Sequence, residues 1–407
     1  MSRVYLGTHD FTGATLLGGG ASPSPFDATV GTGGDYADIQ AAITGVGGTD
    51  ISLLMISDVT EDSNIAVPSG GNLLIHLQTH TLTMGANQFT YSGAANVYIR
   101  GNGPDSGAEI DYTQTVISEN LFDNVAFTSS VVDAQGFLFD NNSNTGGVNF
   151  FSGAIQKLRD VKADLINQPS KGFELRENGS YATNIEIVGG GTLCHSCLVL
   201  GTSGSGKSVS ATQLLFSGTF HPSVGALICY DKTSCTGVVT NHSTGDMEIG
   251  IQNSTLVNLS NISAQDMNLS LDGTGGSTVT NCDLGTGELI IFNSDDHTIA
   301  NVTTTNVIID NSSSEDVFLA NSVIDGATTL DGDRWSIANC KFRGGLTLAG
   351  TCSYFQFVNC QFGADAGSGS NTLTINSGAL RTSLSNSRAD AAIVDNGTDS
   401  STDYILY

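Results

Sequence analysis

The chain has 407 residues, of which 50 are glycine, 7% are aromatic and 13% are charged. Its formal net charge of −26 at pH 7 argues against binding to nucleic acid, anionic membranes or other polyanions. No window is apolar enough to span a membrane. This composition favours a narrow core of small aliphatic side chains interrupted by frequent turns.

Residues 1–28 form the first distinct segment. They contain Gly18-Gly19-Gly20 and Ser22-Pro23-Ser24-Pro25 without any core periodicity, which is typical of flexible or extended chain. The first residues show no basic stretch followed by an apolar run, so we expect no secretory signal. We predict an N-terminal arm or attachment segment.

A short amphipathic helix is predicted directly after this arm. Asp35 is suited to the N-cap, and we expect the helix to end before Gly45. The apolar face of this helix would comprise Tyr36, Ile39, Ala42 and Ile43. Placed ahead of a stack of coils, the helix would cover the open apolar end.

From Ile51 to about Thr236 the sequence predicts short β-strands at irregular spacing. The loops between them are long enough to host a binding surface. The candidate strands are Ile51–Ile56, Leu73–Leu77, Val97–Arg100, Val131–Asp133, Phe137–Phe139, Ile185–Val188 and Leu198–Leu200.

One segment in this region matches the phosphate-binding loop pattern G-x-x-x-x-G-K-S. Its pattern residues are Gly201, Gly206, Lys207 and Ser208, and residues 226–231 resemble a strand that supplies an acidic magnesium ligand. That chemistry also requires a parallel sheet covered by helices, and only residues 209–217 are suited to a helix. We therefore interpret the match as chance, expect no nucleotide cofactor, and keep a P-loop NTPase as a minor alternative.

The cysteines of the same region suggest a zinc site only superficially. Cysteine and histidine are the usual zinc ligands, and this region contains Cys194, His195 and Cys197, with Cys229 and Cys235 further along. In a β-strand, however, residues three apart point to opposite faces, and the second pair has the wrong interval. Packed or solvent-facing thiols are favoured over zinc.

From about residue 237 to residue 387 an asparagine recurs at steps of 18 or 20 residues, with a final step of 27. The repeated residues are Asn241, Asn261, Asn281, Asn301, Asn321, Asn339, Asn359 and Asn386. This period indicates a solenoid whose unit cannot bury its apolar face alone. A leucine-rich framework is missing, and the short β-segments joined by Asn, Gly and Ser turns predict a parallel β-helix.

The repeat also predicts which side chains face inward. Coils stacked about 4.8 Å apart place equivalent residues in columns along the long axis. The apolar residues two positions before the asparagines would form one inward column: Val239, Leu259, Val279, Ile299, Leu319, Ile337, Phe357 and Leu384. The asparagines would occupy a tight turn in the left-handed conformation, with their amides bonded from coil to coil. Cys282, Cys340 and Cys360, each following an asparagine, would be small buried residues rather than disulfide partners.

Acidic residues fall into register along one edge of these coils. Five and six positions before successive asparagines stand Asp295, Asp296, Glu315, Asp316, Asp333 and Arg334, with His297 and Trp335 just inside. Stacked carboxylates repel one another unless a cation or Arg334 shares them. The favoured interpretation is a solvated polar edge. Two others stay open: a Ca²⁺ site formed by Asp295, Asp296, Glu315, Asp316 and Asp333, and a glycosidase-type site with Asp296, Asp316 and Asp333 as candidate catalytic acids beside Trp335 as a sugar platform.

The predicted organisation is all-β: residues 29–395 form the parallel β-helix behind a short capping helix, and residues 396–407 form a tail. The segment Gly33-Gly34-Asp35-Tyr36-Ala37-Asp38-Ile39-Gln40-Ala41-Ala42-Ile43, together with the asparagine coils, resembles pectate-lyase-like proteins, which include pectin methylesterases and many phage tailspikes. The resemblance covers about residues 30–395 and implies a right-handed single-stranded parallel β-helix. No catalytic motif of those enzymes is present, so no catalytic residue is carried over.

The leading functional hypothesis is a virion structural protein of phage type: a spike, fibre or decoration protein on the head or tail. The resemblance, the expected lack of an export signal and the arm favour it. It would be assembled in the host cytoplasm as a homotrimer, contact other virion proteins through the arm, and contact host surface glycans. The alternative is a polysaccharide lyase or glycoside hydrolase of the same fold. A bacterial adhesin would normally carry an export signal.

Overall fold

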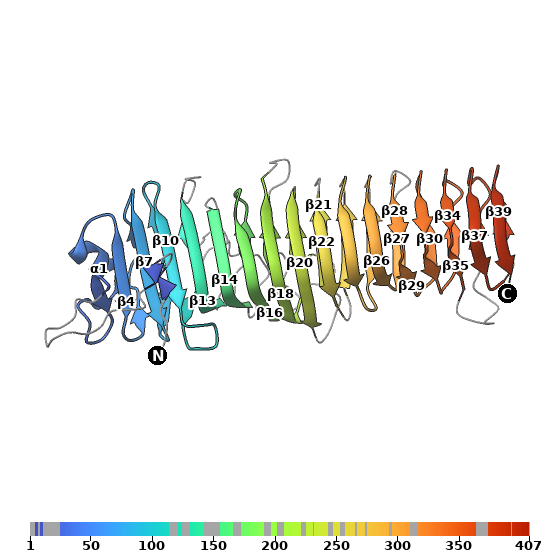
Figure 1. Cartoon of the computed structure of the whole chain (residues 1–407). Coiled ribbons are helices and arrows are strands. Elements are labelled where there is room, and N and C mark those ends of the chain that lie inside the picture. Colours follow the sequence, from blue (N-terminus) through green and yellow to red (C-terminus); the bar gives the residue numbers. More distant parts are fainter. Residues whose placement is uncertain are drawn as a thin grey trace.

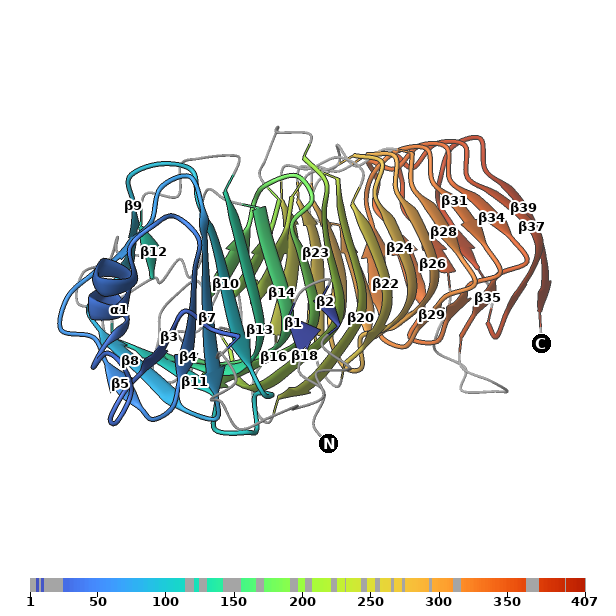
Figure 2. The same ribbon diagram turned by 60° about the vertical axis from the view of Figure 1, so that its left-hand side comes forward.

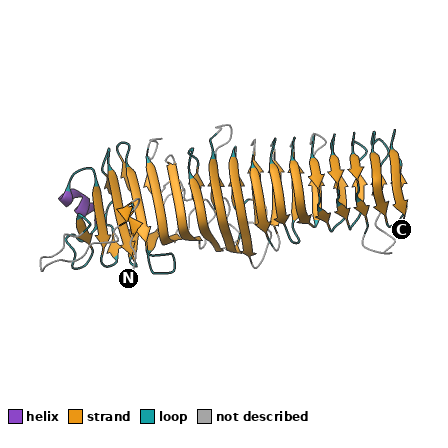
Figure 3. Cartoon of the chain, in the orientation of Figure 1, coloured by secondary structure: helices purple, strands orange, loops and turns teal. Residues whose placement is uncertain are grey.

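The computed structural model describes residues 5–6, 9–10, 25–113, 121–123, 130–141, 155–165, 172–190, 197–201, 207–220, 225–230, 232–242, 247–252, 257–264, 267–272, 275–292, 295–309, 316–363, 373–391 and 393–406. Within these ranges the chain is a parallel β-solenoid in which each coil lies on the preceding one (Figure 1). The described residues contain one helix, α1, at the N-terminal end of the stack (Figure 3). The predicted parallel β-helix is confirmed. No described helix is long and apolar enough to cross a bilayer.

The strands of each coil lie on successive faces of the solenoid (Figure 2). The first face contains β3 (Ala28–Val30), β4 (Ile51–Met55), β7 (Asn72–Gln78), β10 (Asn96–Gly101), β13 (Val131–Asn141), β14 (Ile155–Leu165), β16 (Tyr181–Gly190), β18 (Val209–Thr219), β20 (Thr233–His242), β22 (Asn258–Ser263), β24 (Thr278–Asp283), β26 (Thr298–Thr304), β28 (Phe318–Ala320), β31 (Ser336–Ala338), β34 (Gln356–Val358), β37 (Ser383–Ala389) and β39 (Ser401–Leu406). From β13 to β26, and again in β37 and β39, one strand continues round a bend onto the second face.

The remaining strands complete the coils. Separate second-face strands are β5 (Val59–Thr60), β8 (Thr81–Gly85), β11 (Glu109–Tyr112), β29 (Val323–Ile324), β32 (Lys341–Phe342) and β35 (Gln361–Phe362). The third face contains β15 (Phe173–Leu175), β17 (Leu198–Leu200), β19 (Leu227–Cys229), β21 (Met247–Gln252), β23 (Met267–Asp272), β25 (Glu288–Phe292), β27 (Asn306–Ile309), β30 (Thr328–Leu330), β33 (Leu346–Leu348), β36 (Leu373–Ile375) and β38 (Val394–Asp395). A further sheet contains β6 (Ile65–Val67), β9 (Phe89–Tyr91) and β12 (Phe122–Asp123), and β1 (Tyr5–Leu6) pairs antiparallel with β2 (His9–Asp10).

The bend between the first and second faces is made by one residue per coil with positive φ. Seven asparagines occupy it in the C-terminal coils, and we call them the asparagine column: Asn261, Asn281, Asn301, Asn321, Asn339, Asn359 and Asn386. Earlier coils place Asp160, Asn184, Gln213 and Gly237 at the same position. Asparagine and glycine suit it because they adopt the left-handed conformation at little cost.

The prediction for the first asparagine of the series is wrong. Thr236 and Val238 pair with Ser260 and Ile262, so Gly237 and not Asn241 precedes Asn261 in the column. Val239 is accordingly 43% exposed instead of inward. The cause is a coil of 24 residues at this point, in which the 20-residue spacing from Asn241 to Asn261 has no structural meaning.

Amide groups of the asparagine column bond from coil to coil. The Nδ2 atoms of Asn281, Asn301, Asn339, Asn359 and Asn386 donate to the Oδ1 of the asparagine one coil earlier at 3.4, 3.0, 3.0, 2.8 and 3.3 Å. Each such bond contributes about 1 kcal/mol or less at an exposed position. The column therefore fixes the register of neighbouring coils more than it adds stability.

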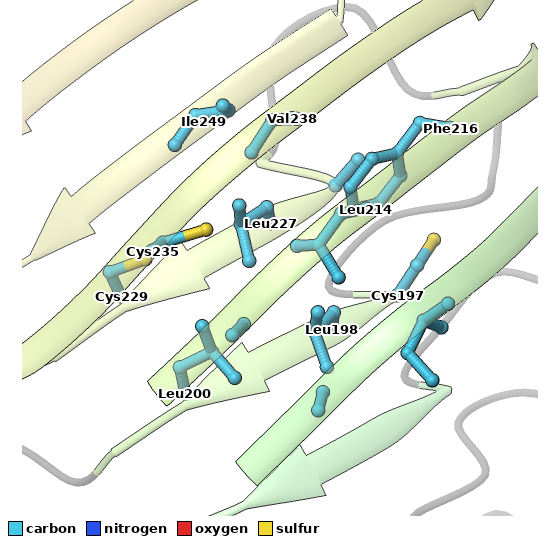
Figure 4. Packing of buried hydrophobic residues seen from close by; sticks show 14 of the residues in the cluster. Cys197, Leu198, Leu200, Leu214, Phe216, Leu227, Cys229, Cys235, Val238 and Ile249 are labelled. Atoms are coloured by element: carbon cyan, nitrogen blue, oxygen red, sulfur yellow. The ribbon is translucent and has the colours of Figure 1, made fainter. Parts of the chain in front are cut away.

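The other seven members of the predicted inward column are buried, with exposed fractions of 2% or less: Leu259, Val279, Ile299, Leu319, Ile337, Phe357 and Leu384. Cys282, Cys340 and Cys360 are also buried and carry free thiols, as predicted. The same packing extends into the irregular coils, where Cys197, Cys229 and Cys235 lie among leucine side chains (Figure 4). The core is one continuous apolar stack along the solenoid.

Helix α1 (Ile39–Val46) packs on β3 and β4 and buries Ile39, Ala42 and Ile43. The predicted helix ends require correction. Asp38, not Asp35, is the N-cap, and its carboxylate accepts from the Ala41 N–H at 2.6 Å. The carboxylate of Asp35 instead accepts from the backbone N–H and the hydroxyl of Thr29.

The helix also continues through Gly45 and ends at Val46. A Cβ at Gly45 would lie 2.3 Å from the Tyr36 ring, so a larger residue would displace that ring, and Gly45 is not a helix stop. The C-terminal boundary of the coils differs as well. β39 pairs parallel with β37, so the stack extends beyond residue 395 to Leu406.

Candidate functional site

The predicted register along the acidic edge is present in the structure. Asp296, Asp316, Arg334 and Tyr354 all have φ between 56° and 59°, as expected for equivalent turn positions in successive coils. Parallel bridges join Gly275 to Asp295 and Asp333 to Ser353. We call this second column of turn residues, continued by Arg381 and Asp399, the turn edge.

Asp316 on the turn edge is neutralised by its neighbour one coil later. Nε and Nη2 of Arg334 donate to Oδ1 and Oδ2 of Asp316, both at 2.7 Å. These hydrogen bonds hold the pKa of the Asp316 carboxyl below its usual range. From the sequence, Arg334 could share the stacked carboxylates, and at Asp316 it does so through a bidentate pair.

The structure does not bring the acidic residues together around a cation position. Among the described residues, no group of three or more His, Cys, Asp or Glu side chains lies close enough to hold a metal ion. Asp295 and Asp296 are exposed and Asp333 is half-buried. Glu315 lies outside the described residues, so calcium binding by the full set stays a prediction.

Trp335 does not form a sugar platform. Its ring is fully buried and stacks on Phe355 with centroids 5.8 Å apart. His297 is also buried, and desolvation lowers its pKa to about 4, so it is neutral at pH 7. Exposed aromatic surface on the turn edge is offered by Tyr354, whose ring is covered on one side by Arg381 at 4.9 Å. Trp335 therefore cannot stack on a sugar in the glycosidase-type site considered above.

The segment that matches the phosphate-binding loop is not followed by the helix that a P-loop nucleotide site requires. The segment suited to a helix after it is β18, which pairs with β16 and β20 inside the first face. Nζ of Lys207 donates to both carboxylate oxygens of Glu177 at 2.7 Å, one coil away. The backbone N–H of Gly201 donates to the carbonyl of Leu175, and the carbonyl of Ser208 accepts from the N–H of Gly179, so both residues bond to the preceding coil. Gly206 lies outside the described residues.

The cysteines near the loop are core residues. Cys197, Cys229 and Cys235 are at most 1% exposed, and burial raises the pKa of Cys235 to about 12. In the part of the chain that the structure describes, these thiols do not belong to a group of three or more potential metal ligands. Cys194 and His195 lie outside the described residues.

An open cavity of about 410 Å³ occurs at the C-terminal end of the asparagine column. We call it the C-terminal groove. Its lining residues are Asn339, Cys340, Lys341, Asn359, Cys360, Gln361, Asn386, Ser387 and Arg388. The asparagines form one wall, and the residues two positions later form the other wall, since Cys340, Cys360 and Ser387 turn into the core.

The second wall carries cationic and amide groups on three successive rungs. Lys341 pairs in register with Gln361, and Gln361 with Arg388. Nη2 of Arg388 donates to Oε1 of Gln361. Among the described residues that line this cavity there is no carboxylate. These residues can donate to anionic and hydroxyl groups, and they include no carboxylic acid for glycoside hydrolysis.

The preceding sequence predictions did not include this groove. The available signal was the position two residues after each asparagine, which changes from Asp283, Thr303 and Val323 to Lys341, Gln361 and Arg388. Only the bend at the asparagines makes these side chains face a common cavity.

Comparison with known proteins gives a distant fold likeness. No protein-family model and no curated protein matches the chain. Among solved structures, a PL6 alginate lyase complex with trisaccharide has 11% identity and a TM-score of 0.34, covering 89% of this chain and 84% of the lyase. Bacteriophage CBA120 tailspike protein 3 has 11% identity and a TM-score of 0.27, covering 88% of this chain and 57% of the tailspike. Geobacillus virus E2 ORF18 has 12% identity and a TM-score of 0.16, covering 82% of this chain and 55% of that protein. No site or activity is transferred from these proteins to this chain.

Proposed function

We propose that the protein is a virion structural protein of phage type, a β-helix spike or fibre that contacts host surface glycans by binding and not by cleavage. We further propose that it assembles as a homotrimer and attaches to other virion proteins through residues 1–28. A spike or fibre of this kind needs long β-sheets whose strands keep a fixed register. The unbroken series of parallel pairings from β3 to β39 supports this.

The observation that favours binding over cleavage is the chemistry of the C-terminal groove. Its lining residues offer cations and amides without a carboxylate. Glycoside hydrolysis canonically requires two carboxylates flanking the bond, one of them protonated at working pH. Asp316 has a lowered pKa and is held by Arg334 on the turn edge, which makes it a poor general acid. Neither the described lining of the groove nor Asp316 therefore supplies a general acid for glycoside hydrolysis.

Two measurements test the proposal. Particles produced from the genome that encodes the chain should contain it by mass spectrometry and display it to a specific antibody under the electron microscope. Light scattering of the purified chain should give three times the monomer mass. Absence of the chain from the particles would reject the virion role, and a monomer at assay concentration would reject the trimer.

A further inference from the structure

We infer that a second copy of the chain packs against the first face of the solenoid between β16 and β37. The contact surface is formed by outward-facing residues of ten successive coils, and we call it the uncharged strip. It consists of the first and third residues of the segments 181–183, 210–212, 234–236, 258–260, 278–280, 298–300, 318–320, 336–338, 356–358 and 383–385. The inference deepens the proposed function and rests on it for the number of copies: in the homotrimer, the three uncharged strips face the threefold axis.

The uncharged strip holds no Asp, Glu, Lys or Arg side chain in any of its ten coils. Its strands lie side by side along the solenoid, in unbroken parallel register (Figure 1). The surfaces on either side of it do carry charge. The turn edge has Asp316 and Arg334, and the second face has the exposed Asp283. Lack of charge is therefore confined to one narrow surface of an otherwise acidic solenoid.

The geometry of the coil does not require neutral residues at these positions. In β14, one coil before the strip begins, Lys157 and Arg159 occupy the places that Tyr181 and Thr183 occupy in β16. The same outward positions of the first face thus accept long charged side chains. Ten coils without a charge at these positions indicate a surface that has to be neutral for another reason.

The net charge of the chain limits which surface a second copy can approach. Each copy has a formal charge of −26, and salt screens the repulsion between two copies only beyond about 10 Å. Opposing carboxylates at short range would cost the most, so the copies repel least where neither surface holds one. The uncharged strip offers this contact over roughly 40 Å of the axis, since successive coils are about 4.8 Å apart. Depletion of charged residues is also typical of the core of a protein–protein interface.

Hydroxyl groups on the strip are already hydrogen-bonded to one another. The side-chain oxygens of Thr183 and Thr212 lie 3.0 Å apart, and Oγ of Ser260 donates to Oγ1 of Thr236 at 2.9 Å. Burying a polar group is costly mainly when the group loses water without gaining another partner. Bonds between neighbouring coils therefore lower the cost of covering the strip.

The C-terminal coils of the strip also expose large apolar side chains. Phe318 is 43% exposed and Val358 is 47% exposed. At the border with the turn edge, Tyr354 and Leu380 are 49% and 42% exposed. Large aromatic and aliphatic side chains supply much of the binding energy when a partner covers them. The strip thus combines a neutral surface with apolar contacts at one end.

Size-exclusion chromatography with light scattering of the full chain tests the inference. The strip variant is Ser336→Glu with Gln356→Glu, which adds two carboxylates on adjacent coils of the strip. The matched control is Thr329→Glu with Thr347→Glu, which adds the same charge on adjacent coils of the third face. Circular dichroism melting shows which variants fold.

A second strip variant, Asn258→Glu with Thr278→Glu, keeps the test informative if the first does not fold. The expected result is three times the monomer mass for the wild type and for the control. Each folded strip variant should have the monomer mass, because carboxylates of the three copies would meet near the axis. Association of the copies should be weakened about a hundredfold or more.

A folded strip variant that keeps the wild-type mass, or a control variant that dissociates equally, would overturn the assignment of the strip and leave the homotrimer standing. A monomeric wild type would overturn both. Detection of the chain in particles is independent of these results, so the virion proposal keeps its own test.

Discussion

Leu319 is fully enclosed by the coil stack. It is 1% exposed and pairs in register with Ile299 and Ile337. Replacing Leu319 by Asp should abolish soluble folding, because it buries a charge without a partner in a narrow apolar column. Replacing Asn321 by Ala should cost about 2 kcal/mol, since it removes one exposed amide contact and places alanine at positive φ. Soluble yield and urea unfolding measure both effects, and a stable Leu319→Asp protein would contradict the packing described.

Val239 and Cys235 provide a separate test of register. Cys235 pairs with Leu259 and is 1% exposed, whereas Val239 pairs with Ser263 and is 43% exposed. Val239→Asp should therefore leave the melting temperature within a few degrees of wild type. Cys235→Asp should prevent folding. The opposite ranking in thermal melts would restore Asn241 to the asparagine column.

Lys207 joins two coils through its ion pair with Glu177, and we predict that it does not bind phosphate. We expect no saturable binding of ATP with magnesium in isothermal titration. Lys207→Ala should lower the free energy of unfolding by about 0.5–1 kcal/mol, because the partly exposed pair with Glu177 is lost. Lys207→Arg, which keeps the charge, is the control. Nucleotide binding that disappears in Lys207→Ala would contradict the β-helix description of this segment.

At the scale of single elements, a buried acid from the residue after β5 lies at the N-terminus of helix α1. The carboxylate of Glu61, 3% exposed, accepts from the backbone N–H of Ile39 at 2.7 Å and of Gln40 at 3.3 Å. Desolvation nevertheless raises the pKa of Glu61 to about 7. The folded protein therefore binds this proton more tightly than the unfolded chain does.

Stability should consequently fall as the pH rises from about 4.5 to about 7, by on the order of 3 kcal/mol from this group, and the loss is complete above that window. Glu61→Gln should remove this part of the pH dependence. The test compares urea unfolding of both proteins at pH 5 and pH 8. Parallel pH profiles would show that Glu61 ionises normally beneath the helix.

The elements differ in how far the sequence could predict them. The turn edge and seven members of the inward column followed from spacing alone, because equivalent backbone positions recur once per coil. The place of Gly237, one coil before Asn261 at the same bend, did not follow from spacing, since the coil between them has 24 residues. Side-chain partners were harder still. The Asp316–Arg334 pair, the burial of Trp335 and the cavity beside Lys341 depend on side-chain direction at each bend, which spacing does not specify.

At the scale of the whole molecule, the protein is an elongated acidic β-solenoid, and Lys341 and Arg388 line the C-terminal groove near one end (Figure 1). Helix α1 covers the apolar N-terminal end of the stack, and the continuous core holds successive coils in register. In the C-terminal groove, Lys341 and Arg388 lie two rungs apart with Gln361 between them.

The central claim is that this rod binds glycan without cleaving it. The most direct measurement is size-exclusion chromatography with light scattering of an acidic surface polysaccharide, before and after prolonged incubation with excess protein. The account predicts co-elution of protein and polysaccharide, and an unchanged polysaccharide chain length after the protein is removed. Shortened chains, with new reducing ends or unsaturated sugars, would contradict it and establish the polysaccharide-cleaving alternative.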